Sequence, residues 1–478
     1  MGHVFREPRR SAGASAARLT LALLLAVMLA PALHAQAGDA PDASGDPAPA
    51  NPVSPARAAQ QAREAEFKAY RTGLADAWPG ELKSIERKKT SLERAEKLYR
   101  SRRKRSKSKG APKGIALKAR MKSLRQVAAI EVELGLAWLA AHQSPGGFWS
   151  CAAFDTECGR LETNTVCSGT GSPQFDVGVT ALALLGFLRA GHTPQEGRYA
   201  PTVRAGLDYL VAVQTKNGML GAETNSQSTY DHVIATLALV EAVAATGSSQ
   251  YKAAAQKGLA KMFSMRNPGA TWRYQPFHSV MKQNPNDTSV TGWAVQSMAM
   301  ARELDMDVDR DAWIDSLTFI VDMTDTSTGR TGYTDRGARP AREVGKDKDW
   351  PADQSESMTA IGLLCRQLIA PTATDRDEKK LREQQAGMIS RLSPVWDRPA
   401  RIDYYFWYQG SLALALYGGD DAYWWADHLI EVAFAHEHED KDAVGSWDPH
   451  RGPWGSVGGR VYSTSLMTLS MQAIIDSD

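Results

Sequence analysis

The chain has 478 residues, of which 43% are hydrophobic and 23% are charged, and its formal net charge at pH 7 is +2. This length allows one large domain or two, and the apolar fraction is enough to bury a sizeable core, which excludes a wholly unfolded chain. The near-neutral total hides an uneven distribution, because residues 82–122 hold 17 Lys or Arg against three Glu, a local charge of +14. The rest of the chain therefore carries −12.

Residues 1–37 have the three parts of a secretory signal peptide. Four arginines in residues 1–18 precede the apolar run LTLALLLAVMLA, and the small-residue sequence ALHAQA follows it. The run is too short for a comfortable membrane span, and no later segment offers another. We therefore expect cleavage after Ala35 or Ala37 and an exported protein, periplasmic or extracellular, with no transmembrane segment after cleavage.

The next two regions are predicted to precede the main fold. Residues 38–57 are rich in Pro, Ala and Asp, which predicts a disordered linker, and residues 58–122 form a partly helical, basic extension. The run SRRKRSKSKGAPKG at 101–114 is either a solvated tether or a docking segment for an anionic envelope polymer. Because export is expected, nucleic acid is not an expected partner.

Three of the four cysteines lie close together in one predicted loop. In an oxidising compartment we expect two of Cys151, Cys158 and Cys167 to form a disulfide. A zinc site built from these thiolates is the alternative. The fourth, Cys365, lies in the apolar run AIGLLCRQLI and is predicted to be a small core residue.

A repeat begins near residue 123. Loops containing glycine or an aromatic residue, usually both, recur at intervals long enough for two helices and two connections. Glycine can end a helix in a left-handed backbone, and the aromatic residue can pack back across the helix pair. The loops are HQSPGGFW (142–149), QTKNGMLG (214–221), RNPGATWRY (266–274), TSTGRTGY (326–333), LSPVWD (392–397) and VGSWD (444–448).

Helices of two kinds alternate with these loops. After each loop comes a helix that is apolar nearly all round, such as DVGVTALALLGFLRAG, and before most loops lies an amphipathic one, such as TVRAGLDYLVAVQ. The first kind belongs inside a protein and the second outside. Residues 123–478 are therefore predicted to form an all-α fold, an (α/α)6 toroid of six helix pairs.

Six such repeats resemble the prenyltransferase and squalene-oxidase repeat superfamily, which includes squalene and hopene cyclases and protein prenyltransferase β subunits. The resemblance covers about residues 125–476 and implies a central cavity that holds an isoprenoid. The segment Asn284 to Ser289 resembles the D-x-D-D-T-A motif of the cyclases, with Asn286 in place of the proton-donating Asp. An amide cannot supply that proton. Asp287 is therefore expected to cap an inner helix and to help line the cavity.

The protein prenyltransferases of this superfamily bind zinc through Asp, Cys and His. The segment RIDYYFWYQGSLAL resembles their Asp and Cys segment, with Asp403 or Tyr405 at the Cys position. Tyr462 or Ser463 stands at the position of the His. We therefore expect neither the acid chemistry nor the zinc chemistry of the superfamily, and no cofactor.

A second candidate metal site lies near the C-terminus. His436 and His438 stand close to several acids, in a pattern that suits zinc or copper. The same two histidines also suit the negative end of an outer helix.

The starts of the inner helices converge at one end of a toroid, and the residues there make the candidate ligand site. A concave site with aromatic walls and a few polar groups is the default place for a ligand. The candidate catalytic acids are Asp287, Glu356 and Asp403. The predicted ligand-binding residues are Asp176, Tyr230, Asp231, His232, Asp287, Trp293, Glu356, Asp403, Tyr404, Trp407, Tyr408, Arg460 and Tyr462.

Three functions are consistent with this pattern. The first is binding of an apolar small molecule or lipid, for which a hopanoid or polyprenyl lipid is what the resemblance implies. The second is an enzyme acting on a glycan through cavity carboxylates between aromatic walls. The third is an envelope scaffold that binds peptide or protein. Apolar cavity walls would favour the first, and an open ring of acids would favour a glycan or a peptide.

Overall fold

The structure is a computed structural model that describes residues 61–74, 115–158, 167–223, 227–276, 285–373, 375–436 and 443–477. The predicted signal peptide (1–37) and linker (38–57) lie outside these residues, as does the basic run at 101–114. Within the described residues, no helix combines the length and the apolar character needed to cross a bilayer.

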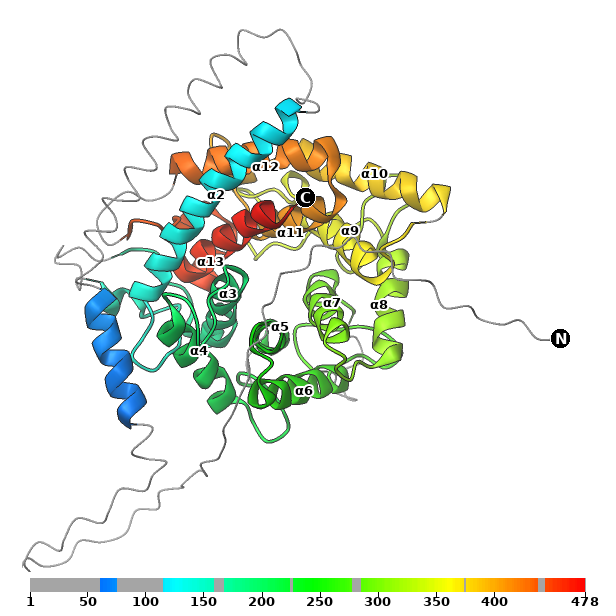
Figure 1. Cartoon of the computed structure of the whole chain (residues 1–478). Coiled ribbons are helices and arrows are strands. Elements are labelled where there is room, and N and C mark those ends of the chain that lie inside the picture. The colour runs from blue at the N-terminus through cyan, green and yellow to red at the C-terminus, as the bar shows by residue number, and fades with distance from the viewer. Residues whose placement is uncertain are drawn as a thin grey trace, which may run out of the picture. The chain divides into compact units, whose positions relative to one another are not determined.

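Six helices form a closed inner ring, as Figure 1 shows. Each packs against the next inner helix, and the last, α13, packs against the first, α3. Most of their residues are buried, as the apolar sequences predict. The inner helices are α3 (Asp176–Arg189), α5 (Ser228–Thr246), α7 (Thr288–Glu303), α9 (Ser357–Ile369), α11 (Tyr404–Tyr417) and α13 (Gly455–Asp476).

An outer helix precedes each inner helix in the chain. The outer helices keep exposed polar faces, which α10 shows most clearly with its charged sequence RDEKKLREQQAGMISR. They are α2 (Ile115–Ala141), α4 (Ala200–Val213), α6 (Ser249–Ser264), α8 (Arg310–Met323), α10 (Arg376–Arg391) and α12 (Gly419–His436). The predicted all-α toroid of six helix pairs is therefore confirmed.

The connections between helices contain only short regular pieces. An isolated antiparallel bridge joins Thr324 and Thr331, and no strand forms among the described residues. The short 3-10 helices are η1 (Phe154–Glu157), η2 (Pro173–Phe175), η3 (Ala352–Gln354), η4 (Pro399–Arg401) and η6 (Pro449–Arg451).

Part of the predicted N-terminal extension belongs to the toroid. Helix α2 begins at Ile115, before the predicted boundary at residue 123, and packs against α12 and α13. Arg120, which the sequence places in the basic extension, forms a buried ion pair with Asp427 of α12. Arg120 is therefore not available to an anionic polymer, because its charge is used to join the first outer helix to the last.

A helix at residues 61–74 also packs on the toroid. The Tyr70 hydroxyl donates to the Arg198 carbonyl at 3.2 Å, just before α4. Arg71 pairs with Glu157, and both side chains are buried or nearly so. This described part of the extension is therefore attached to the first two repeats.

Tryptophans in the Gly-aromatic loops tie each loop to its own outer helix. The indole N–H groups of Trp149 and Trp272 donate to carbonyl oxygens of α2 and α6 at 2.6 and 2.8 Å. Trp447 makes the corresponding bond to α12 at 3.3 Å. Each bond supplies a partner to a carbonyl near the end of a helix. These tryptophans are fully buried, as expected of core residues.

Glycines of the same loops bring each repeat close to the next. Gly147, Gly218 and Gly445 have φ of +85°, +90° and +83°. A Cβ at Gly218 would lie 2.5 Å from the carbonyl oxygen of Lys257 in α6, and one at Gly445 would lie 2.4 Å from that of Leu134 in α2. The last of these contacts joins the final repeat to the first.

Replacing Gly218 by Ala should therefore destabilise the protein more than the same change at Gly269. Both glycines have positive φ, but a Cβ at Gly269 meets nothing within 4 Å. We expect Gly269→Ala to lower the free energy of unfolding by about 1 kcal/mol and Gly218→Ala by about 3 kcal/mol, because only the latter adds a backbone clash. Urea denaturation measures both, and equal losses would show that the close approach is unimportant.

Candidate functional site

A cavity of about 140 Å³ lies among the N-terminal halves of the inner helices. All six inner helices contribute to its wall, as does the segment at 340–342. This is the end of the ring at which the sequence places the candidate ligand site.

Aromatic side chains make up most of the large groups in the wall. Among the described residues that line the cavity, only Asp231 and Arg342 are charged. The cavity is therefore mainly apolar, with phenolic hydroxyls prominent among its polar groups. The aromatic residues are Phe175, Tyr230, Tyr274, Trp293, Tyr333, Tyr405, Trp454 and Tyr462.

Hydrogen bonds hold several of these tyrosines in place. The Tyr274 and Tyr333 hydroxyls bond to each other, and the Tyr230 hydroxyl bonds to Ser289 Oγ. The Arg273 guanidinium lies over the Tyr274 ring, 4.3 Å from its centroid, and donates to the Tyr333 hydroxyl at 3.2 Å. Burial raises the pKa of Tyr274 to about 12 and that of Tyr230 well above its usual value, so both stay neutral at physiological pH.

Asp287 caps α7 and lies behind the cavity wall. Its Oδ1 accepts from the backbone N–H of Ser289 at 2.7 Å and of Val290 at 3.2 Å, and its Oδ2 accepts from Arg273 at 3.2 Å. The side chain is 0% exposed and is not among the residues that line the cavity. Burial raises the pKa of the Asp287 carboxyl, while the bond from Ser289 and the charge of Arg273 oppose that rise. The expected capping is observed.

The other two candidate catalytic acids are also paired with arginines. Glu356 accepts from Arg330 Nε at 3.1 Å and from its terminal nitrogen at 2.6 Å. Asp403 caps α11 by accepting from the Phe406 N–H at 3.1 Å, and its other oxygen accepts from Arg342 at 3.3 Å. Both carboxylates are buried, so each depends on its arginine for compensation.

The three remaining charged residues among the predicted ligand-binding residues lie in different surroundings. Asp231 is the one predicted acid that lines the cavity. Asp176 Oδ1 accepts from the Cys151 N–H at 2.7 Å, and burial raises the pKa of its carboxyl. Arg460 is 1% exposed and donates to the Ser168 carbonyl at 2.7 Å, so it anchors the α2–α3 connection.

Trp293 joins the cavity wall to a polar cluster deeper in the ring. Its ring lies 5.3 Å from that of Tyr408, at an interplanar angle of 21°. The Tyr408 hydroxyl accepts from Arg189 at 3.2 Å, and Arg189 pairs with Glu241 at 2.6 Å. The predicted residue Tyr408 therefore lies against a wall residue and is not itself part of the wall.

Three further predicted residues are not part of the wall. His232 accepts from the Leu220 N–H through Nδ1 at 3.1 Å, and its Nε2 lies 3.0 Å from the Gly258 carbonyl oxygen. Because an N–H can only donate and a carbonyl can only accept, this ring is neutral with its proton on Nε2. Tyr404 and Trp407 pack edge to face against each other, with ring centroids 5.4 Å apart.

Several wall residues are not predicted by the sequence as ligand contacts. Tyr274 and Tyr333 belong to Gly-aromatic loops, for which the sequence indicates a core role. Residues 455–458 form a helical turn before Gly459, whose φ of +68° interrupts α13, and Val457 and Gly458 of this turn line the cavity.

The zinc centre of the protein prenyltransferases does not fit the corresponding residues. Asp403 is bonded to Arg342, and Tyr405 and Tyr462 line the cavity. Burial raises the pKa of both phenols well above the usual value, so both are neutral phenols in this wall.

The C-terminal metal candidates lie at the edge of the described residues. His436 ends α12, but its side chain is outside the described part, and His438 is outside it entirely. Their role as metal ligands stays a prediction.

The predicted disulfide is not formed in the structure. All four cysteines are free, and Cys158 and Cys167 both approach Nε2 of His142. Cys151 is fully buried and takes no part in this group. Cys365 is buried in α9, where burial raises the pKa of its thiol to about 12, in agreement with its predicted place in the core.

The fold and the cavity define an α/α toroid with an aromatic-lined central cavity. No protein-family model matches the chain, and no curated protein matches it in sequence.

Solved structures match at low similarity, and the likeness concerns the fold alone. An inactive variant of an α-1,6-mannanase from Salegentibacter is 11% identical, with a TM-score of 0.47 over 74% of this chain and 99% of that one. An unsaturated glucuronyl hydrolase specific for heparin is 14% identical, with a TM-score of 0.48 over 75% and 97%. A type II terpene cyclase from Scytonema is 15% identical, with a TM-score of 0.42 over 74% and 98%.

Burial of His232 predicts a loss of stability in mild acid. Desolvation lowers the pKa of His232 from 6.5 to about 4, so the unfolded chain binds a proton that the folded chain does not. The stabilisation is complete above about pH 6.5 and is lost as the pH falls toward about 4, by up to about 3 kcal/mol. Urea denaturation at several pH values should show a smaller loss for His232→Gln than for the native protein. Parallel curves would contradict the assignment.

Proposed function

We propose that the central cavity binds an apolar or isoprenoid-type ligand, without the acid or zinc chemistry of the superfamily that the repeats resemble. The observation that carries this proposal is the composition of the wall, where the described residues include eight aromatic side chains and two charged ones. Apolar surface removed from water supplies the driving force for such a ligand.

The pairing of the cavity-end acids supports the same choice. Asp287, Glu356 and Asp403 each bond to an arginine of a neighbouring connection. A glycan hydrolase needs two carboxylates that face the substrate. Only Asp231 has that position among the predicted acids, so the wall favours an apolar ligand over a glycan.

The size of the cavity sets a limit on the ligand. Its 140 Å³ is the space open to the centres of water-sized molecules, and one water needs roughly 10–15 Å³ on this measure, so the cavity has room for on the order of ten waters. Ten waters occupy roughly 300 Å³ as liquid. That is the lower end of small-molecule pockets. A short isoprenoid chain, or one end of a longer lipid, matches this space better than a complete polycyclic lipid.

One buried donor favours a ligand with an oxygen atom. The indole N–H of Trp293 has no hydrogen-bond partner among the described residues, and the side chain is 1% exposed. Leaving such a donor unpaired costs about 1–3 kcal/mol. We propose that a ligand hydroxyl or carbonyl accepts this bond after a small shift of the wall, because the N–H itself is covered in the structure.

We also propose that the protein is exported and that residues 82–114 help to attach it to an anionic envelope polymer. The signal-peptide pattern of residues 1–37 supports export, and the basic composition of residues 82–114 supports attachment. Arg120 is excluded from this role by its pairing with Asp427.

A larger side chain in the cavity should block the ligand. Ile234 lines the cavity, whereas Ile314 is 47% exposed on α8. We expect Ile234→Trp to weaken farnesol binding about tenfold or more by isothermal titration calorimetry, because the indole would occupy the site, and Ile314→Trp to leave it unchanged. Equal affinities in the two variants, or binding of maltotriose but not farnesol, would overturn the proposal.

Removing the unpaired donor should discriminate between ligands. Trp293→Phe keeps an aromatic ring but loses the N–H, so we expect about fivefold weaker binding of farnesol and unchanged binding of the hydrocarbon farnesene. The same titrations measure both ligands. A similar loss for both would show that the Trp293 N–H does not bond to the ligand.

A further inference from the structure

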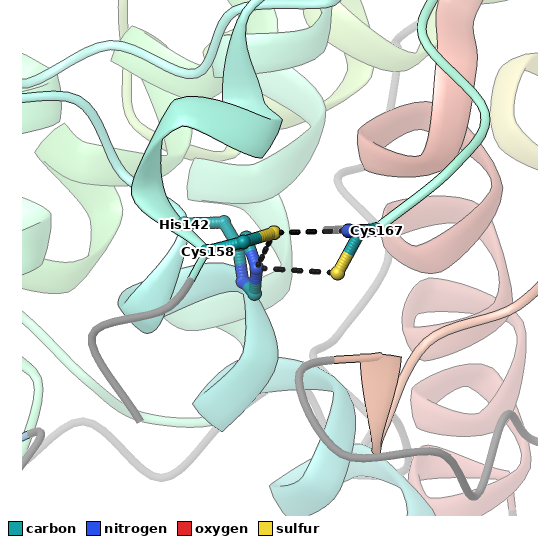
Figure 2. A group of neighbouring side chains, drawn as sticks. All are labelled: His142, Cys158 and Cys167. Carbon is teal, nitrogen blue, oxygen red and sulfur yellow. Dashed lines mark hydrogen bonds between the residues drawn. The ribbon is translucent and has the colours of Figure 1, made fainter. Parts of the chain in front are cut away.

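The α2–α3 connection, residues 142–175, brings together three side chains with metal-binding atoms. His142 follows α2 directly, Cys158 follows η1, and Cys167 begins the next described segment (Figure 2). Their ligand atoms all lie within 4.8 Å of one another. Among the described residues, this is the only group of three or more His, Cys, Asp or Glu side chains whose ligand atoms lie so close together. None of its members lines the ligand cavity.

The distances fit a tetrahedral metal ion. Cys158 Sγ and Cys167 Sγ lie 3.4 and 3.6 Å from His142 Nε2. A zinc ion binds thiolate sulfur at about 2.3 Å and imidazole nitrogen at about 2.0–2.1 Å, and the tetrahedral angle then separates sulfur from nitrogen by roughly 3.6 Å. The three atoms can therefore ligate one ion with little movement.

The imidazole is already oriented as a metal ligand. His142 Nδ1 lies 2.8 Å from the Trp138 carbonyl oxygen, which can only accept, so Nδ1 carries the proton. The lone pair is then on Nε2, which faces both sulfurs. The Trp138 ring stacks on the imidazole with centroids 4.1 Å apart and holds its plane. Metal-bound histidines usually donate their second N–H to such an acceptor.

The two sulfurs also have polar neighbours. The Cys167 backbone N–H donates to Cys158 Sγ at 3.2 Å. Arg460, whose side chain is buried, donates to the carbonyl and the hydroxyl of Ser168, the residue next to Cys167. A nearby N–H donor and a cation favour negative charge at these sulfurs, whereas the contact with Cys158 and burial raise the pKa of the Cys167 thiol, so metal binding would have to displace that proton. His142 and Cys167 are 2% and 5% exposed, whereas Cys158 is half-buried, so the group is open to solvent on the Cys158 side only.

We propose that His142, Cys158 and Cys167 bind one zinc ion through Nε2 and two thiolates, with water as the fourth ligand. Imidazole and thiolate together select zinc, or copper in its reduced state, over magnesium and calcium. Two thiolates neutralise the charge of the ion. A disulfide between the same cysteines is the competing state, because it would remove both sulfur ligands.

The ion would hold one side of the ligand cavity. Just after Cys167, the Gly171 N–H donates to the Cys151 carbonyl at 2.7 Å, and the Ser172 N–H donates to the Val457 carbonyl at 2.8 Å. Val457 and Phe175 both line the cavity. A metal at Cys167 would therefore fix the segment that joins α2 to the wall of the cavity.

The test is the metal content of the intact chain, purified without chelators from cells supplied with zinc. We expect about one zinc per chain by inductively coupled plasma mass spectrometry, because the site is preformed. The variants His142→Ala, Cys158→Ser and Cys167→Ser should each lose nearly all of it. The matched controls Cys151→Ser and Cys365→Ser should keep it.

A cobalt titration of the apo protein checks the ligands independently of how the variants fold. Thiolate charge-transfer bands and tetrahedral d–d bands are expected, and zinc should displace the cobalt. Three results would overturn the proposal. They are absence of metal with both thiols free, an intact mass two hydrogens lower that reports a disulfide, and copper in place of zinc. Metal retained in all three ligand variants would equally exclude these residues.

Discussion

Six inner helices begin at the same end of one ring, and this convergence governs the chemistry of the cavity. Their unpaired N–H groups and the positive ends of their dipoles gather there and favour acidic residues. Asp287 and Asp403 meet this demand as caps, and Glu356 stands at the same position of α9. A buried carboxylate is costly unless it is paired. The arginines of the connections supply that pairing, and aromatic side chains are left to form the wall.

Arginine pairing also explains the path of the α8–α9 connection, residues 324–356. Arg330 returns to Glu356 at the start of α9, whereas Arg342 reaches Asp403 at the start of α11. Arg342 lines the cavity as well, so one side chain offsets a buried acid and closes part of the wall. The charge that compensates a helix cap thus places the segment at 340–342 over the cavity.

The fold could be predicted from the sequence because its determinants are local. Apolar helices, the Gly-aromatic loops before them and an acid at several helix starts are visible within single repeats. The cavity wall depends on long-range contacts instead. Asp403 and Arg342 are 61 positions apart, and no local pattern connects them. The sequence of α11 also does not show which of its faces turns toward the cavity. In the structure Tyr405 lines the cavity and Tyr404 does not.

The cysteine loop illustrates the same limit of local pattern. Spacing alone groups Cys151, Cys158 and Cys167, but the fold separates Cys151 from the other two and supplies His142 from the end of α2. A histidine one residue beyond a helix gives no sequence signal of metal binding.

The two longest connections between helices, residues 142–175 and 324–356, are held in place by different interactions. A long segment without regular structure loses much conformational entropy when it is fixed in place. Residues 324–356 are held by ion pairs to helix caps, which also neutralise buried acids. Residues 142–175 have no comparable arginines of their own, apart from one outside the described part, and the cation near them is Arg460 of α13. A metal cross-link at His142, Cys158 and Cys167 would join both halves of that connection to the end of α2. The same connection bonds to α13 through Ser168 and Ser172, so holding it in place would also support the contact between the first and last repeats.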